Sequence, residues 1–374
     1  MRERMPKSPR SFGNDSTPNL VGQPFDLIDT PAVIVDLDVV EANVHRFQAY
    51  CSAHGIGLRP HIKTHKIPEF AALQMKAGAV GINCQKITEA EVMADAGISD
   101  ILITFNILVS AKLARLRRLA ERCSLTVTAD NETVVAGLAE AMAGAGRPLD
   151  VLVECDTGAG RCGAQSPEAA RDLARRIADR PDLRFRGLMT YPKAGAARAA
   201  AAWLAAAKSL CEEDGLSCPV VSSGGTPDMW AAGDLGTVTE YRVGTYIYND
   251  RSLLARNVCT VADCALTVLA TVVSRPTDER AMVDAGSKAL TSDLLGLDGH
   301  GFIPDLPEAS IFALSEEHGF VDLRNGADRP QVGDKVRIIP NHACVVSNLF
   351  DRVYAIRNGK VADILAVQAR GCSQ

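Results

Sequence analysis

The sequence lacks the features that would assign it to a membrane, a secretory route or a nucleic acid. None of its apolar runs reaches about 18 residues, the length that a membrane-spanning helix needs. The N-terminal run MRERMPKSPRSFGNDSTPN is polar and rich in turn formers, without the apolar core of a signal peptide. The net charge of −5 provides no basic surface for a phosphate backbone. We therefore expect no membrane partner and no nucleic-acid partner.

Paired cysteines are also lacking. The 11 cysteines are scattered without paired spacing, and their number is odd. This pattern does not indicate the disulfide framework of a small secreted domain, and it favours reduced thiols in the cytosol. We therefore expect a cytoplasmic protein.

The length and the order of segments predict two domains. At 374 residues the chain is longer than one ordinary core requires. Over residues 28–255, short strand-like runs alternate with Ala-rich helical stretches. Repeated βα units predict a parallel sheet, and eight of them predict a closed (β/α)8 barrel, with an open doubly wound sheet as the alternative. The eight predicted strands begin LRPHI (58–62), GINCQ (81–85), ILITF (101–105), LTVTA (125–129), LDVLVEC (149–155), LRFRGLMTY (183–191), PVVSS (219–223) and EYRVGTYIY (240–248).

Residues 256–374 have a different pattern. Runs such as LTVLATVVSRP and KVRIIPN alternate or stay apolar, with Pro and Gly between them. Asn358 and Gly359 separate two strand-like runs, which strongly favours a hairpin. We predict a C-terminal all-β domain over these residues, joined by the strand AVIVDLD (32–38), and a flexible lead-in over residues 1–27.

A basic run follows the first predicted barrel strand, at the end where reactive residues gather in such barrels. In RPHIKTHK, Arg59, His61 and Lys63 are two residues apart from one another. Because successive side chains of a strand point to opposite faces, these three would share one face. Basic groups that face a barrel interior are costly unless they hold an anion or a carbonyl compound. A lysine beside other cations has a lowered pKa, which leaves its amine able to form a Schiff base. A solvated loop with surface charge is the alternative.

Small and hydroxylated residues lie at two later strand ends. The seventh predicted strand ends in Ser222–Thr226 (SSGGT), and the eighth contains Arg242–Tyr246 (RVGTY). Such turns expose backbone N–H groups and a hydroxyl, and late barrel strands are the usual place for a phosphate. Each turn alone is weak evidence for a phosphate site, because Gly and Ser are common in any turn. Together they predict a phosphate site.

The run Gly158–Gly163 (GAGRCG) matches the dinucleotide fingerprint G-x-G-x-x-G. It follows the fifth predicted strand rather than the first. The acid expected about 20 residues later would be Asp179 or Asp182, and both fall in a helix-end loop. A nicotinamide site is therefore the weaker interpretation.

The run Pro340–Cys344 (PNHAC) indicates a metal site. His342 and Cys344 are two residues apart on a segment that we predict to be extended, so their side chains would point the same way and suit one divalent metal. No CxxC and no second His–Cys pair is nearby, which would leave open positions, as in a catalytic site. A buried cysteine beside a half-exposed histidine, with no metal, is the alternative.

Together, the runs RPHIKTHK, GINCQKITEAEVMADAGISDI, DTGAGRCG, SSGGT and NHAC resemble the D-threonine aldolase/D-serine dehydratase group of alanine-racemase-like pyridoxal-phosphate (PLP) enzymes. The resemblance extends from about residue 28 to the C-terminus. It implies a PLP-binding (β/α)8 barrel followed by a β-domain, a small D-amino acid as substrate, and a homodimer.

The resemblance also implies roles for single residues. Lys63 carries the cofactor, and His342 and Cys344 hold a divalent metal, which could be zinc, manganese or magnesium. Arg161 contacts the cofactor, which removes the dinucleotide interpretation of GAGRCG. The other cofactor-binding positions that it implies are Gln85, Tyr191, Ser223, Gly225, Thr226, Gly244, Thr245 and Tyr246.

These residues suit two reactions of D-3-hydroxy amino acids. Cleavage of the Cα–Cβ bond gives glycine and an aldehyde, which is the aldolase reaction that we expect. Removal of the Cα proton by Lys63 and loss of hydroxide give a 2-oxo acid and ammonia, the dehydratase alternative with D-serine or D-3-hydroxyaspartate.

The sequence departs from parts of the group in two places. Pro-Lys-Ala-Gly follows Tyr191 where some members have a His-containing loop, and Cys344 stands where some aldolases have Asp. A non-catalytic PLP carrier is a further alternative, which the C-terminal β-domain with its His–Cys pair argues against.

Overall fold

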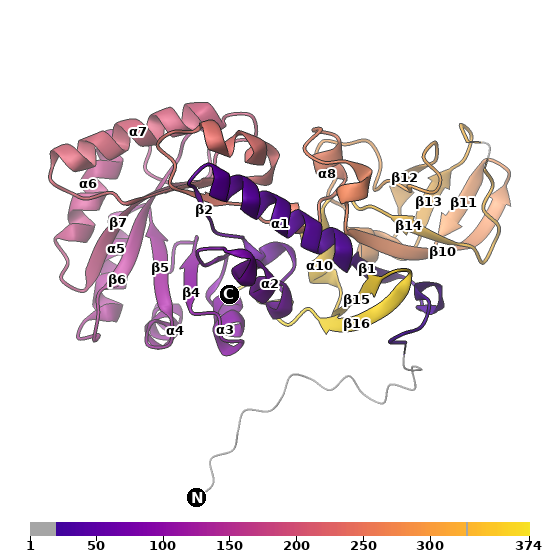
Figure 1. Cartoon of the computed structure of the whole chain (residues 1–374), viewed down its shortest axis with the longest axis horizontal. Helices are drawn as coiled ribbons and strands as arrows, with labels where there is room; N and C mark the ends of the chain where they lie inside the picture. Colours follow the sequence, from indigo (N-terminus) through magenta and orange to yellow (C-terminus); the bar gives the residue numbers. More distant parts are fainter. Residues whose placement is uncertain (1–19, 327) are drawn as a thin grey trace, which may run out of the picture.

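The computed structural model describes residues 20–326 and 328–374, and these form two parts that lie side by side (Figure 1). One part is built on a parallel sheet covered by helices, and the other is rich in antiparallel strands. Most of the predicted lead-in lies outside the described residues. Its last residues pair with the strand-rich part, where Gly22 N donates to Val361 O over 2.8 Å.

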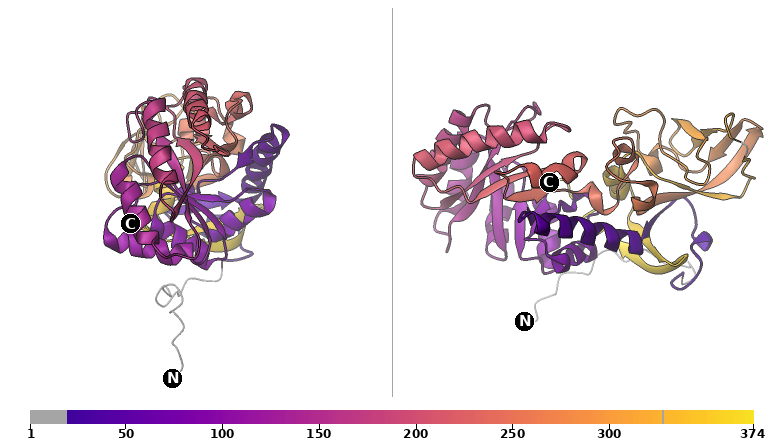
Figure 2. Two further views of the ribbon diagram at one scale, coloured as in Figure 1. Left: turned by 90° about the vertical axis from the view of Figure 1, so that its left-hand side faces the viewer. Right: turned by 45° about the horizontal axis from the view of Figure 1, so that its top comes forward.

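The first part contains the eight predicted parallel strands, in the order β2-β9-β8-β7-β6-β5-β4-β3. Their bounds are β2 (Gly57–Leu58), β3 (Ile82–Cys84), β4 (Asp100–Ile103), β5 (Ser124–Ala129), β6 (Leu149–Cys155), β7 (Leu183–Thr190), β8 (Val220–Gly224) and β9 (Glu240–Arg242). Six amphipathic helices cover the outside of this sheet: α2 (Pro68–Ala77), α3 (Ile87–Asp95), α4 (Ser110–Ala120), α5 (Glu132–Met142), α6 (Pro167–Ala178) and α7 (Ala197–Glu213). Figure 2 shows these helices around the strands.

The two edge strands of this sheet meet, so the sheet closes. The segment after β2 lies beside β3, where Asn83 N donates to Pro60 O over 2.7 Å and His61 forms a parallel bridge with Asn83. Closure leaves no exposed parallel edge. The predicted (β/α)8 barrel is therefore confirmed, and the open doubly wound sheet is excluded.

The eighth predicted strand is shorter than expected. β9 ends at Arg242, and a 3₁₀ turn, η4 (Thr245–Ile247), follows. Gly244 approaches the neighbouring turn closely, since a Cβ on it would lie 2.6 Å from Thr64 Oγ1. The prediction of one strand over 240–248 was wrong, because this close contact with the turn after β2 bends the chain.

The second part contains an eight-stranded sheet with the order β12-β13-β11-β10-β1-β15-β16, and β14 pairs with β10. β1 joins it from the N-terminal side, as predicted, antiparallel to β10 and parallel to β15. The β15–β16 hairpin turns at Asn358 (φ 51°) and Gly359 (φ 73°), as predicted. The strands are β1 (Ala32–Asp36), β10 (Leu266–Thr277), β11 (Arg280–Val283), β12 (Ser310–Leu314), β13 (Gly319–Asp322), β14 (Lys335–Ile338), β15 (Arg352–Arg357) and β16 (Lys360–Ala366).

Two short helices interrupt this strand-rich part: α9 (Ser287–Leu290) and α10 (Ala343–Leu349). His342 is the N-cap of α10, and Cys344 lies in its first turn. The prediction of an extended segment through His342 and Cys344 was therefore wrong. The apolar residues Ala343 and Val346 lie on the buried face of α10, so the helix docks onto the core.

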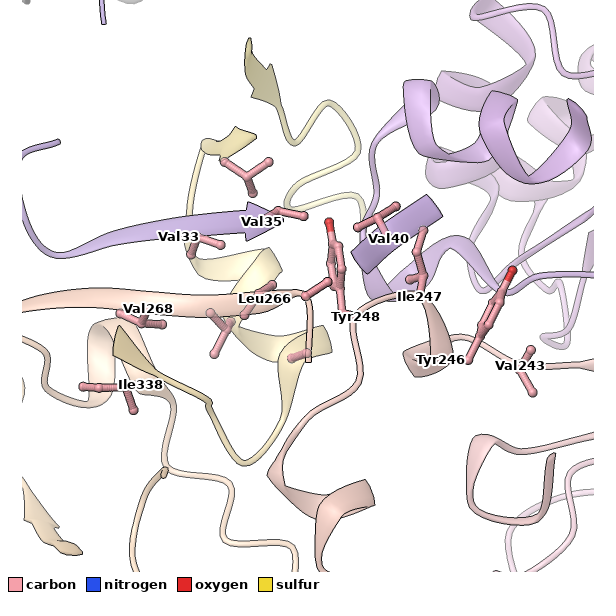
Figure 3. Packing of buried hydrophobic residues seen from close by; sticks show 14 of the residues in the cluster. Val33, Val35, Val40, Val243, Tyr246, Ile247, Tyr248, Leu266, Val268 and Ile338 are labelled. Carbon is pink, nitrogen blue, oxygen red and sulfur yellow. The ribbon is translucent and has the colours of Figure 1, made fainter. Parts of the chain in front are cut away.

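The long helix α1 (Leu37–Ala53) connects the two parts (Figure 1). It begins at Asp36, whose carboxylate accepts from the N–H groups of Asp38 and Val39. Figure 3 shows the shared core beneath it, where Val40 of α1 packs near Tyr248 and Leu266. The junction is thus a continuous apolar core rather than a linker.

The C-terminus returns to the barrel. Thr88 at the start of α3 binds Gln374 O through its N–H (3.1 Å) and its hydroxyl (2.9 Å).

Among the described helices, none is both long and apolar enough to cross a bilayer.

Candidate active site

A cavity of about 380 Å³ lies at the C-terminal ends of the barrel strands, where the strand-rich part faces them. Its volume is in the range of small-molecule sites. Residues from both parts line it. The predicted site residues among them are Lys63, Gln85, Arg161, Tyr191, Gly225, Thr226, Gly244, Thr245, His342 and Cys344.

Lys63 lies on the short 3₁₀ turn η2 (Ile62–Thr64) that follows β2. Its Nζ lies 5.9 Å from the centre of the Tyr191 ring. Burial lowers the pKa of this amine; Cys344 opposes the shift, and Arg161 adds to it. A lowered pKa increases the fraction of free amine, the form that attacks a carbonyl.

The second lysine of the same run has a different environment. Lys66 is buried, with its Nζ 3.1 Å from Glu89 Oε1 and 3.4 Å from Ala369 O. This ion pair holds the amine away from the cavity, and Lys66 does not line it. Of these two lysines, Lys63 is therefore the one that can react with a ligand.

A chain of hydrogen bonds fixes the wall beside Lys63. His61 Nε2 lies 3.1 Å from Gln85 Oε1, and Gln85 Nε2 donates to Thr104 O over 2.9 Å. His61 Nδ1 accepts from the N–H of Lys63, so Nε2 carries the proton. Burial and the charge of Lys63 lower the pKa of His61 well below its usual value. His61 is therefore a neutral donor that orients Gln85.

Arg161 and Tyr191 lie together at the mouth of the cavity. The Arg161 guanidinium lies 5.1 Å from the centre of the Tyr191 ring and 3.5 Å from Glu154 Oε1. Both side chains are largely exposed, so they offer a face on which a flat ligand can stack.

The Gly158–Gly163 loop does not have the geometry of a dinucleotide site. The N–H groups of Gly158 and Gly160 donate to Asp156 Oδ1, at 2.9 and 3.1 Å. A pyrophosphate would need such groups free at the start of a helix. The nearest helix, α6, begins only at Pro167.

The two predicted phosphate turns are neighbours in the structure. β8 and β9 are adjacent strands, and Gly225, Thr226, Gly244 and Thr245 line the cavity at their ends. Gly225 has φ 113°, a conformation that side chains rarely adopt. These turns form a compact cradle on one side of the cavity.

Two predicted cofactor positions lie outside the cavity lining. Ser223 is buried, and its Oγ has no hydrogen-bond partner among the described residues. Tyr246 is fully buried in the core between the two parts, and its hydroxyl accepts from Gln74 Nε2 (Figure 3). The Tyr246 side chain is therefore a core residue, because the bend at Gly244 turns it towards α1.

Arg242 lines the cavity but was not among the predicted site residues. It is buried inside the barrel and donates to Ser222 Oγ over 2.5 Å and to Thr190 O over 2.7 Å. Burial lowers its pKa to about 10, a value at which it stays cationic at neutral pH. The position of Arg242 in the RVGTY run, just before Gly244, was the sequence signal that could have identified it as a site residue.

His342 and Cys344 form the wall that faces the barrel. Their side chains are hydrogen-bonded to each other, and Thr64 Oγ1 lies 3.1 Å from Cys344 Sγ. His342 Nδ1 lies 2.8 Å from Asp293 Oδ2. Burial opposes both charged forms, but their mutual attraction lowers the pKa of Cys344 and raises that of His342 to about 9.

The chemistry of this pair suits a metal with open coordination positions. Histidine nitrogen and cysteine thiolate are typical zinc ligands, and a carboxylate on the second ring nitrogen commonly orients such a histidine. Asp293 is in that position. Within the described ranges, no cluster of three or more His, Cys, Asp or Glu residues could hold a metal, so a closed protein site is not formed there.

Comparisons with known proteins agree with this arrangement. The family model "Alanine racemase, N-terminal domain" matches residues 35–252, and the model "Putative serine dehydratase domain" matches residues 265–356. The chain is 36% identical over 366 residues to a D-threonine aldolase from Arthrobacter sp., covering 94% of this chain and 96% of that protein.

Two solved structures are similar over nearly the whole chain. A D-threonine aldolase from Filomicrobium marinum has a TM-score of 0.85 and 35% identity, covering 94% of this chain and 98% of that chain. D-threo-3-hydroxyaspartate dehydratase from Delftia sp. HT23 has a TM-score of 0.83 and 30% identity, covering 92% of this chain and 98% of that chain. That dehydratase also has solved His-to-Ala and Cys-to-Ala variants, with the cysteine two positions after the histidine, and the latter structure is described as metal-free.

The barrel with a lysine at its first strand end, followed by a strand-rich domain, defines the alanine-racemase-like class of proteins. Within this class the chain belongs to the D-threonine aldolase/D-serine dehydratase family. It is a PLP-dependent lyase, which sets aside the non-catalytic carrier.

The residues of the cavity fit PLP. Lys63 offers a reactive amine, the turns at Gly225 and Gly244 offer a phosphate cradle, and Tyr191 with Arg161 offers a flat face for a ring. All of these groups line one cavity, as attachment of a single cofactor requires.

Proposed function

We propose that the protein cleaves D-3-hydroxy amino acids to glycine and an aldehyde, with PLP on Lys63 and a divalent metal on His342 and Cys344. One observation carries the proposal: Lys63 and the His342–Cys344 pair line the same cavity from opposite domains. A substrate attached at the lysine side would therefore present its 3-hydroxyl to the metal side.

Bound PLP supplies an electron sink for the electron pair left at Cα when a bond to that carbon breaks. The chain's own residues prepare this step. Lys63 would hold the cofactor through its amine, and His61 fixes Gln85 beside it. Gly225 and Thr226 would bind its phosphate at another part of the same cavity.

The His342–Cys344 wall supplies the second requirement, activation of the 3-hydroxyl. A zinc, manganese or magnesium ion there would act as a Lewis acid and lower the pKa of that hydroxyl. His342 must bind a metal as the neutral ring, so metal affinity falls as the pH drops. Asp293 would fix the ring orientation through Nδ1.

The dehydratase is the second candidate, and the His–x–Cys spacing favours it. The pair altered in the Delftia dehydratase variants has the same order and spacing as His342 and Cys344. In that reaction Lys63 would take the Cα proton, and the same wall would help hydroxide leave. The two reactions thus share their residues and differ in the bond that breaks.

A substrate panel tests the proposal. Protein with PLP and each of the three metals would be given D-threonine, D-serine, D-3-hydroxyaspartate and their L-forms. We expect activity on D-forms only, with glycine and acetaldehyde from D-threonine. A 2-oxo acid and ammonia, without glycine, would establish the dehydratase instead, and activity on L-forms alone would overturn both.

A further inference from the structure

The cavity has one cationic side chain that no protein group engages. Arg256 lines it and is exposed, and its side chain makes no hydrogen bond or ion pair within residues 20–326 and 328–374. The other basic side chains of the lining have partners. Arg161 pairs with Glu154, Arg242 binds Ser222 and Thr190, and His342 lies beside Asp293. The neutral His61 binds Gln85, and Lys63 lies over the Tyr191 ring, where it would hold the cofactor.

Arg256 belongs to the metal side of the cavity. It follows the short helix α8 (Arg251–Leu254), which begins at the buried Asp250. One carboxylate oxygen of Asp250 accepts from Leu253 N, and the other accepts from Ala343 N over 3.1 Å. A single buried carboxylate therefore ties the first turn of α8 to the turn that carries Cys344.

A second contact strengthens this tie. Arg251 N donates to Pro340 O over 3.0 Å, and Arg251 Nη1 donates to Asn341 Oδ1 over 3.1 Å. The segment before His342 is thus fixed to α8 on both sides. Arg256 follows this fixed segment, and it lines the same cavity as His342 and Cys344.

We propose that Arg256 selects substrates with a carboxylate on Cβ, and hence that the enzyme prefers D-3-hydroxyaspartate to D-threonine. This inference rests on the proposed function, which places the hydroxyl of Cβ at His342 and Cys344. The other substituent of Cβ then lies at the same wall. A guanidinium without a protein partner suits a carboxylate there and gains nothing from a methyl group.

The test compares two substrates that differ only in this substituent. In Arg256→Met, the ratio of kcat/KM for D-3-hydroxyaspartate to that for D-threonine should fall about tenfold, the loss of one charge-assisted hydrogen bond. Arg256→Lys should recover part of the ratio, because it keeps the charge. Arg180→Met is the matched control: Arg180 is also exposed, but it follows α6 at the opposite end of the barrel, and the ratio should stay at the wild-type value.

Two results would overturn the role of Arg256. An equal loss for both substrates would mean that it binds the carboxylate on Cα, and an unchanged ratio would mean that it binds neither. Binding of D-aspartate and D-alanine, followed by the cofactor absorbance, gives a second readout that needs no cleavage. If neither hydroxy amino acid is cleaved, the proposed function fails, and the loss or retention of D-aspartate preference in Arg256→Met still decides the role of Arg256.

Discussion

The two walls of the cavity are built in different ways. The barrel wall comes from several strand ends whose residues bind one another, such as His61, Gln85 and Thr104. The opposite wall comes from one segment around His342, which the barrel holds from outside through Asp250 and Thr64. Cofactor binding should therefore depend on the barrel alone, whereas the geometry of the His342–Cys344 wall depends on how the two domains dock.

The largest expected effect is that of Lys63→Ala. Removal of the amine should abolish covalent attachment of PLP and all turnover, because no other lysine lines the cavity within the described residues. Borohydride reduction followed by peptide mapping of the wild type should place the label on Lys63.

Lys66→Met is the control for this experiment. It should keep the label on Lys63 but unfold more easily, by about 3–5 kcal/mol, because it leaves Glu89 buried without its partner. A label on Lys66 in the wild type would reverse the assignment of the two lysines.

His342→Ala should separate the role of the His342–Cys344 wall from that of the barrel wall. We expect the cofactor absorbance to remain while turnover is lost, because His342 does not take part in the barrel network. Exhaustive chelation of the wild type should have the same effect, and addition of the metal should restore it. Full activity after chelation would show that the pair has no metal.

Asp293→Asn should have a smaller effect on the same wall. Loss of the carboxylate on Nδ1 should weaken metal affinity by about 10–100-fold, since this group orients the ring. Turnover of Asp293→Asn should recover at high metal concentration. This recovery would distinguish the variant from one that lacks a metal-binding side chain. Asp298→Asn in the same loop is the matched control, and wild-type metal affinity is expected for it.

Features built from local sequence could be predicted, whereas features built from contacts between distant segments could not. The number and chain order of the eight barrel strands, and the hairpin at Asn358, follow from local patterns of apolar and turn residues, and the structure confirms them. Contacts between distant segments escaped prediction. The bend at Gly244 is set by Thr64, and the helical turn at Cys344 is set by docking of α10 onto the core.

The same reason explains which cavity residues were missed. Arg242 lies in the RVGTY run but was not singled out there, and Arg256 lies in no motif. Asp250 and Asp293 acquire their roles from partners that are 93 and 49 residues away in the sequence. Family motifs indicated Lys63, His342 and Cys344, because these residues lie within runs that can be compared directly. Residues that act through contacts between distant segments have no such run.

The last prediction concerns acid stability, to which His65 contributes from the buried segment directly after Lys63. Its Nδ1 accepts from Ile67 N over 3.0 Å and its Nε2 lies 3.3 Å from Gln74 Oε1, and burial lowers its pKa to about 4. Between about pH 6.5 and pH 4 the unfolded chain binds a proton here that the folded chain does not. The free energy of unfolding should therefore fall with decreasing pH over this range, by up to about 3 kcal/mol from this group.

Urea unfolding of the PLP-loaded protein at several pH values measures this slope. In His65→Asn, whose amide oxygen can replace Nδ1 as the acceptor for Ile67, the slope between pH 6.5 and pH 4 should be smaller than in the wild type. His61 also stays neutral when buried, but it is present in both proteins, so the difference between the two slopes isolates His65. Equal slopes would mean that His65 binds its proton equally well in the folded and unfolded chains, and that burial does not oppose its protonation.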